Sequence, residues 1–563
     1  MKIYDNSNLA ESYSGVTTPL TFSFARYVYQ EVYKNFCDMM GVNKKTIKEN
    51  ADMFPEMVVY IGGRMYYDLT NWYRLISFLP GYSFNKGFFE EMLGVNKKAD
   101  FQKKTSESFF KRWFYYFPKT FWQAFKILVY FVFMDLLVKR FCSDFDDTYG
   151  QYNDKDLSQE SEKSLKGIFT LLTSKLVVHW KVPIANDFAV MVSTGIVRKL
   201  FDKWLPKENS YTFLYVGSTT PLISLDPGLV IMSIVEVVKA DNKFYDLFKS
   251  DKTPEVILGI LRKQYREHII SKKIFDYIKK YGDRMPGELK LESKCLNEYP
   301  EIFIQIIINA VKNNQSFLHK NIERASMKDY NIGLLRHFTL SFFLDWAKNT
   351  IRMREETRFK RTLIFGFARK LFVELGKRYS DNNIIDSSDD IFYLTIEEVL
   401  GDTTDDKNQF KVLIKERKKS ISSLKTIEFP RRIETDLSIS DFEKAYTEKK
   451  EEKIVSKVMK GMVVSMGGLE KLVDEALVMK EFDPSANFND KIIITSHTDP
   501  GWSLVFPLIK GLVVERGGML SHAAIVAREL NIPCIVGVEN ATDIIRSGET
   551  IELDLNGGEV KKI

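Results

Sequence analysis

The apolar residues of this chain change their spacing near Gly461, and this change constrains the fold more than any other feature. Before that point, long stretches such as residues 334–379 repeat apolar residues at every third or fourth position, which predicts helices. After it, short β-branched runs alternate with glycine-rich turns, which is typical of strands. We therefore predict a multidomain protein in which a large, mostly α-helical domain precedes a C-terminal α/β domain.

These patterns divide the chain into three segments. Residues 1–433 form the predicted helical domain, and residues 434–460, which are rich in Lys and Glu, form a predicted charged linker. Residues 461–563 form the predicted α/β domain, with a helix expected between the second and third of its strand-like runs. These runs lie at 491–495, 511–515, 534–538 and 550–554.

The composition is that of a soluble globular protein and excludes several functional classes. The 563 residues include 81 Lys and Arg against 75 Asp and Glu, a net charge of +6, which is too balanced to predict a nucleic-acid-binding surface. Four widely spaced cysteines and an N-terminus without a signal-peptide core predict a cytoplasmic protein. The longest apolar run, 127–134, is too short to span a membrane; we interpret it as a buried helix, with a membrane-interface or partner contact as the alternative.

The segment 515–529, ERGGMLSHAAIVARE, contains the residues best suited to chemistry. Gly517 and Gly518 can adopt backbone conformations that are closed to other residues, and Ser521 is a good N-cap for the helix that follows. The unsatisfied amides of the first helical turn, which includes Ala523, form a local anion site. We therefore predict that these four residues bind phosphate.

His522 directly follows this N-cap. The positive end of the helix disfavours the imidazolium form, so the ring stays neutral and nucleophilic, and a phosphohistidine is chemically reasonable. On these residues alone, a histidine that only caps or packs at a helix start is the alternative.

Three motifs of the C-terminal region support the first interpretation. They are TDPGW at 498–502, GGMLSHAAIVARELNIPCIVGV at 517–538 and GETIELDLNGGEV at 548–560. Together they resemble the swivelling phosphohistidine domain of PEP-utilising enzymes, a family that includes phosphoenolpyruvate synthase, pyruvate phosphate dikinase and rifampicin phosphotransferases. The resemblance implies that His522 is the residue that is phosphorylated and dephosphorylated.

Weaker motifs in residues 1–433 resemble the helical region of rifampicin-phosphotransferase-like proteins, which implies that this domain binds the acceptor substrate. The aromatic-rich stretch 109–145 could line a pocket for a flat acceptor, although core packing is the alternative. The motifs are NSNLAESYSGVTTPLTFSF at 6–24, YGDRMPGELKLES at 281–293, RMREETRFKR at 352–361 and DDIFYLTIEEV at 389–399.

Two of these motifs supply candidate acceptor-site residues. Arg284 and Glu288 flank a Met-Pro-Gly turn, and Arg352 and Glu355 lie at helical spacing. An Arg could meet the transferring phosphoryl group while a Glu deprotonates the acceptor. For residues 352–361 the alternative is a solvated, salt-bridged helix face. No histidine spacing predicts a metal site.

Compared with the family, we expect this protein to have neither an ATP-grasp region nor a PEP/pyruvate-binding barrel. We therefore expect no tightly bound cofactor here, and a separate ATP-grasp protein that uses ATP and Mg²⁺ to phosphorylate His522. A small-molecule acceptor in the helical domain would then take the phosphoryl group, without nucleic acid or a membrane span. The alternatives are a phosphoenolpyruvate synthase-like (pyruvate, water dikinase) subunit and a non-catalytic phosphohistidine regulatory or scaffold protein. If the linker is partly helical, Gly461 and the Gly467-Gly468 pair are expected to act as hinges.

Overall fold

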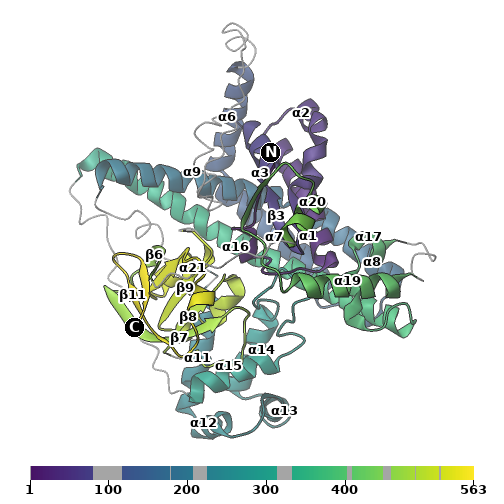
Figure 1. Ribbon diagram of the computed structural model, residues 1–563, viewed down its shortest axis with the longest axis vertical. Helices are drawn as coiled ribbons and strands as arrows, with labels where there is room; N and C mark the ends of the chain where they lie inside the picture. The colour runs from purple at the N-terminus through teal and green to yellow at the C-terminus, as the bar shows by residue number, and fades with distance from the viewer. Residues whose placement is uncertain are drawn as a thin grey trace. The chain divides into compact units, whose positions relative to one another are not determined.

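The computed structural model divides into two compact units, each described here by itself (Figure 1). Unit 1 comprises Met1–Lys203, Leu289–Glu292 and Thr339–Glu451, and unit 2 comprises Trp204–Glu288, Ser293–Phe338 and Glu452–Ile563. Unit 2 thus joins part of the region expected as one helical domain to the C-terminal region. The predicted fold class, a large helical region with a C-terminal α/β region, is confirmed. The structure describes residues 2–79, 117–177, 179–206, 223, 225–312, 332–401, 409–447, 458–488, 490–518 and 521–563.

Unit 1 is mainly helical. Its longest helix, α16 (Leu334–Asp381), starts in unit 2 and confirms the helix predicted from the apolar spacing at 334–379. Helix α9 (Lys181–Trp204) packs along it, and Asn186 Nδ2 donates to the carbonyl of Thr350 at 2.9 Å. The other helices of unit 1 are α1 (Pro19–Met39), α2 (Lys44–Glu49), α3 (Leu69–Ser77), α6 (Phe117–Val132), α7 (Met134–Asn153), α8 (Glu162–Leu172), α17 (Ile396–Leu400), α19 (Phe410–Leu424) and α20 (Ile439–Thr447).

Unit 1 also contains a small antiparallel sheet that the sequence did not predict. Its strand order is β2-β3-β1-β4, and Tyr4 pairs with both Asp68 and Ile433. The last strand and α20 include residues of the expected linker, of which residues 448–457 lie outside the described residues. The strands are β1 (Lys2–Asp5), β2 (Val58–Ile61), β3 (Arg64–Asp68) and β4 (Arg432–Thr435).

Unit 2 contains an eight-stranded sheet in the order β5-β12-β11-β7-β8-β9-β10-β6. The pairs β7–β8, β8–β9 and β9–β10 are parallel, and β8 and β9 are buried along their whole length, which explains their unbroken apolar sequences. The four predicted runs correspond to β8, β9, β10 and β11. The strands are β5 (Val458–Lys460), β6 (Met462–Ser465), β7 (Lys471–Met479), β8 (Ile492–Thr495), β9 (Gly511–Val514), β10 (Cys534–Val536), β11 (Thr550–Asp554) and β12 (Glu559–Lys562).

The expected hinges lie inside this sheet. Gly461 joins β5 to β6, and its amide donates to the carbonyl of Gly558 at 2.8 Å. Gly467, with φ 62°, lies against the ring of Pro533. Because the chain is paired into one sheet on both sides of Gly461, rotation there would break the sheet. The expectation that these glycines are hinges is therefore wrong.

In unit 2, α11 (Asp226–Ala240) and α15 (Glu301–Lys312) lie next to the sheet (Figure 1). Two short 3₁₀ helices, η8 (Pro500–Leu504) and η9 (Phe506–Leu508), contact α11. At this contact, Gly228 of α11 lies so close to the Pro507 ring and the Ser503 carbonyl that a side chain on it would overlap both. The helices of unit 2 are α11 (Asp226–Ala240), α12 (Asn242–Lys249), α13 (Pro254–Gln264), α14 (Ile269–Tyr281), α15 (Glu301–Lys312), α21 (His522–Glu529) and α22 (Ala541–Ile544).

The apolar segment around 127–134 is less buried than expected. In α6 the side chains of Trp122 and Leu128 are 67% and 59% exposed, whereas α7 buries Phe141 and Phe145. The interpretation as a buried helix is therefore wrong for α6. Within the described part of the chain, one stretch, Glu162–Trp204, is long and apolar enough to cross a membrane, and α6 and α7 pass the same test only as a pair bent by 65°. The core helices of soluble proteins pass this test too.

Candidate functional site

His522 is the first residue of α21 and is almost completely buried. It is 1% exposed, and its ring lies over that of Phe506, with the centroids 6.2 Å apart and the planes inclined by 27°. Ser521 is the N-cap, and its Oγ accepts a hydrogen bond from the amide of Ala524 at 3.3 Å, while Ala523 is buried in the first turn. The imidazole therefore stands at the positive end of a capped helix.

Hydrogen bonds of the residue that follows β9 fix the start of the loop before α21. Glu515 accepts hydrogen bonds from the amide and the hydroxyl of Thr542, both at 2.7 Å, which fixes the end of the strand. Gly517 has φ 125°, a conformation that favours glycine, and a Cβ on Gly518 would meet no atom within 4 Å. The predicted phosphate-binding residues Gly517, Gly518, Ser521 and Ala523 thus lie at or just before one helix start, and their contact with phosphate stays a prediction.

A second polar cluster joins the TDPGW loop to the Met-Pro-Gly turn. Asp499 accepts hydrogen bonds from the amide of Gly287 and, at 2.9 Å, from that of Gly501. Arg284 and Glu288 are buried beside it. Burial, and then the charge of Glu288, raise the pKa of the Asp499 carboxyl to about 8, although Arg284 and the two amides act in the opposite direction. The structure therefore brings the predicted Arg284 and Glu288 together around Asp499, a residue that the sequence did not single out.

Unit 1 contains a mainly apolar pocket of about 170 Å³. Aromatic and aliphatic side chains of α1, α3 and α9 form most of its wall, among them Phe36, Trp72 and Phe188. None of the described residues of the aromatic stretch 109–145 lines it. A pocket of this kind, with a few polar groups at one side, is the usual form of a small-molecule site.

The polar groups of this pocket come mainly from α16. Arg354, Arg358 and Arg361 line it at spacings of four and three residues, so they lie on one face of the helix. Asp187 of α9 faces them, and its Oδ1 lies 3.7 Å from Arg354 Nε. Arg358 Nη1 lies 3.4 Å from Oε1 of Glu355, which is 1% exposed. This end of the pocket can hold an anion.

The two predicted acceptor-site residues on α16, Arg352 and Glu355, differ in their position relative to the pocket. Arg352 Nη2 donates to Asp135 at 3.3 Å and to Asn349 at 2.9 Å, and it does not line the pocket. Glu355 supports Arg358 without lining the pocket itself. Because Glu355 is fully buried, the alternative of a solvated helix face is wrong for this part of the motif. The sequence reasoning missed Asp187 and Arg361, although the spacing of the three arginines was visible.

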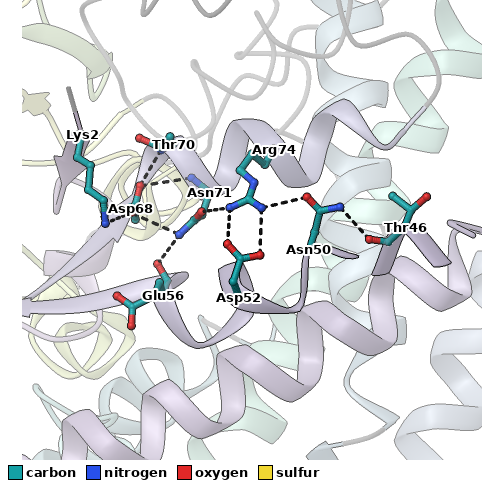
Figure 2. Close-up of polar contacts among 9 residues, drawn as sticks. All are labelled: Lys2, Thr46, Asn50, Asp52, Glu56, Asp68, Thr70, Asn71 and Arg74. Atoms are coloured by element: carbon teal, nitrogen blue, oxygen red, sulfur yellow. Dashed lines mark hydrogen bonds and ion pairs between the residues drawn. The ribbon is translucent and has the colours of Figure 1, made fainter. Parts of the chain in front are cut away.

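Figure 2 shows a polar network that fixes α3, which supplies Trp72 to the pocket wall. Asp68 caps this helix by accepting from the amides of Thr70 at 2.9 Å and Asn71 at 3.3 Å. Arg74, near the other end of α3, makes a two-point contact with Asp52 at 3.0 and 3.2 Å. The wall of the pocket is therefore anchored at both ends of the helix.

Within the described residues, no group of three or more His, Cys, Asp or Glu side chains could hold a metal ion. The loop histidine His497 places Nδ1 2.8 Å from the hydroxyl of Ser496.

Comparisons with known proteins identify two parts of the chain that match known families. The model of the PEP-utilising enzyme mobile domain matches residues 488–558, which include His522, and the model of the rifampicin phosphotransferase fourth domain matches residues 184–355. Rifampicin phosphotransferases of Bacillus subtilis (strain 168) and Bacillus cereus are 27% and 25% identical to the chain over 69% and 67% of its length. Phosphoenolpyruvate synthase of Aquifex aeolicus is 41% identical over 20% of the chain and 12% of its own length.

The chain spans less than half of the two rifampicin phosphotransferases, 46% and 44% of their lengths. The two matched models cover separate parts of the chain, residues 184–355 and 488–558. The chain therefore contains a region similar to the mobile domain of PEP-utilising enzymes and is similar over two thirds of its length to rifampicin phosphotransferases.

Proposed function

We propose that the chain is a phosphotransferase component in which His522 carries a phosphoryl group from an ATP-dependent donor to a small molecule bound in the pocket of unit 1. The observation that carries the proposal is His522 at the capped start of α21, within the region that matches the mobile domain. The donor would be a separate ATP-grasp protein that binds ATP and Mg²⁺. Four free, buried cysteines fit the reducing cytoplasm, where ATP is abundant.

The chemistry takes two balanced steps. First, a ring nitrogen of His522 attacks phosphorus, so that an N–P bond forms as the bond to the donor oxygen breaks. Then an acceptor oxygen attacks the same phosphorus, so that an O–P bond forms, the N–P bond breaks and the acceptor proton passes to a base. Asp187 is the one carboxylate among the described residues that line the pocket, and we assign it as that base. Arg354 and Arg358 would neutralise the phosphoryl oxygens.

Intact-mass measurement tests the first step. The chain is incubated with ATP, Mg²⁺ and a candidate ATP-grasp protein, and we expect an acid-labile gain of about 80 Da for one phosphoryl group. The gain should be absent from His522→Gln. Glutamine is chosen because it keeps a polar side chain of similar size at this buried position. His497→Gln is the matched control and should keep the gain. Labelling of His522→Gln, or no labelling with an active donor, would contradict the proposal.

A phosphoenolpyruvate synthase-like activity is the second candidate, because the phosphoenolpyruvate synthase of Aquifex aeolicus is 41% identical over 113 residues, against 27% over 410 residues for the rifampicin phosphotransferase of Bacillus subtilis. The rifampicin phosphotransferases match over a much longer part of the chain, which favours transfer to another acceptor. Phosphoenolpyruvate formed from pyruvate by the phosphorylated chain would reverse this preference. A stable phosphohistidine that only changes binding to a partner would indicate a regulatory protein.

A further inference from the structure

Arg361 differs from the other two arginines of the pocket. The guanidinium of Arg354 faces Asp187, and that of Arg358 faces Glu355. Arg361 makes no hydrogen bond or ion pair with any residue that the structure describes, and its Nε is fully buried. Arg361 lines the pocket, so an anionic ligand held there can supply the partner that its guanidinium lacks among the described residues.

Four tyrosines lie around Arg361 without neutralising it. Its charge acts on the phenol groups of Tyr13, Tyr29, Tyr33 and Tyr67, all of which line the pocket. Burial raises the pKa of each phenol above its ordinary value, so all four stay protonated and neutral. Neutral hydroxyls can donate hydrogen bonds to a bound anion, but they do not cancel the positive charge.

The size of the pocket limits the apolar part of its ligand. The pocket measures about 170 Å³. A dry engineered cavity of about 150 Å³ holds benzene, whereas pockets for drug-sized ligands measure about 300–1,000 Å³. The apolar wall formed by Phe36, Trp72 and Phe188 therefore fits a single ring rather than a large fused system.

We infer that the acceptor presents one apolar ring bearing an anionic group, with the ring against Phe36 and Trp72 and the anion on Arg361. The inference rests on the phosphotransferase function proposed above and names the class of its acceptor. Arg361 is then the residue that selects anionic acceptors over neutral ones. The transferring phosphoryl group is also anionic, and we assign its binding to Arg354 and Arg358.

Calorimetric titration of the full, unphosphorylated chain tests this inference with two probes, benzoate and benzyl alcohol, which share the ring and differ in charge. We expect benzoate to bind at least about tenfold more tightly, and Arg361→Met to remove that advantage while changing the affinity for benzyl alcohol by less than about threefold. Arg361→Lys should keep part of the affinity for benzoate. Arg352→Met is the matched control, because Arg352 lies on the same helix and bonds to Asp135 outside the pocket.

The inference would be overturned by equal affinities for the two probes, by no binding of either, or by unchanged benzoate binding by Arg361→Met in a chain that circular dichroism shows to be folded. Inorganic phosphate distinguishes the two sources of the anion. If phosphate displaces benzoate and loses affinity in Arg361→Met, this arginine serves the phosphoryl group and the inference is wrong. The titration needs no phosphorylation, so the two hypotheses can fail separately. If the wild-type chain binds benzoate through Arg361 but an active donor does not phosphorylate His522, the proposed function is refuted and the inference about the ligand stands.

Discussion

Gly501 and Met285 lie so close together that a methyl group on Gly501 would overlap the Met285 carbonyl group. The TDPGW loop thereby packs directly on the Met-Pro-Gly turn, backbone against backbone. We expect Gly501→Ala to lower the free energy of unfolding of unit 2 by about 1–3 kcal/mol, because overpacking forces the backbone to shift. Urea denaturation measures this, with Gly259→Ala as the control. Gly259 lies within α13, where a Cβ meets no atom within 4 Å, so that variant should be neutral or more stable.

The pKa of Asp499 predicts a pH dependence of stability. Its value is about 8 in the folded chain and about 3.8 in the unfolded one. Between these values the folded state holds a proton that the unfolded state has lost, so stability falls as the pH rises. Asp499→Asn lacks this titration, so the wild type should lose stability relative to it by up to about 1.4 kcal/mol per pH unit. If the stability of the wild type and of Asp499→Asn changed with pH in the same way, this expectation would be contradicted. Asp251→Asn, at an exposed position, is the control and should follow the wild-type profile.

The cap of α21 should matter for the helix that presents His522. Ser521→Ala removes the acceptor of the Ala524 amide and should cost about 0.5–2 kcal/mol. Hydrogen exchange of the amides in the first turn should accelerate, while Ser521→Thr, which keeps a hydroxyl, should change it less. Unaltered exchange in Ser521→Ala would show that other contacts hold this turn.

Asp68 should influence the pocket through α3. The carboxylate is buried and caps the helix, so Asp68→Ala should lower stability by about 1–2 kcal/mol. Asp68→Asn retains an acceptor oxygen and should lose less. Chemical denaturation of both variants gives the comparison, and an equal loss in the two would assign the effect to charge instead of capping.

The strands could be predicted where both faces of the sheet are buried. Residues 492–494 and 511–514 form unbroken apolar runs because of that burial. Strand β7, Lys471–Met479, was missed because Asp474 and Glu475 interrupt its apolar pattern on a partly exposed stretch. The small sheet of unit 1 was missed because two of its strands, Lys2–Asp5 and Arg432–Thr435, begin and end with polar residues and pair across almost the whole length of unit 1's sequence.

The site could be predicted where the chemistry is local in the sequence. His522 and its N-cap are neighbours, so one motif identifies both. The contact between Asp499 and Gly287 joins residues 212 positions apart, which no local pattern reveals. Arg361 was overlooked because it ends a charged run, and only the fold shows that this face of α16 lines a pocket rather than meeting water.

Strand β12, Glu559–Lys562, lies between β5 and β11, so these residues are interior to the sheet. A proteolytic cut or premature stop before Glu559 would leave β11 with an open edge and β5 without its neighbour. An unpaired edge strand is a template for aggregation. Loss of these few residues should therefore be recognised first as insolubility of the protein, well before any effect on phosphoryl transfer could be measured.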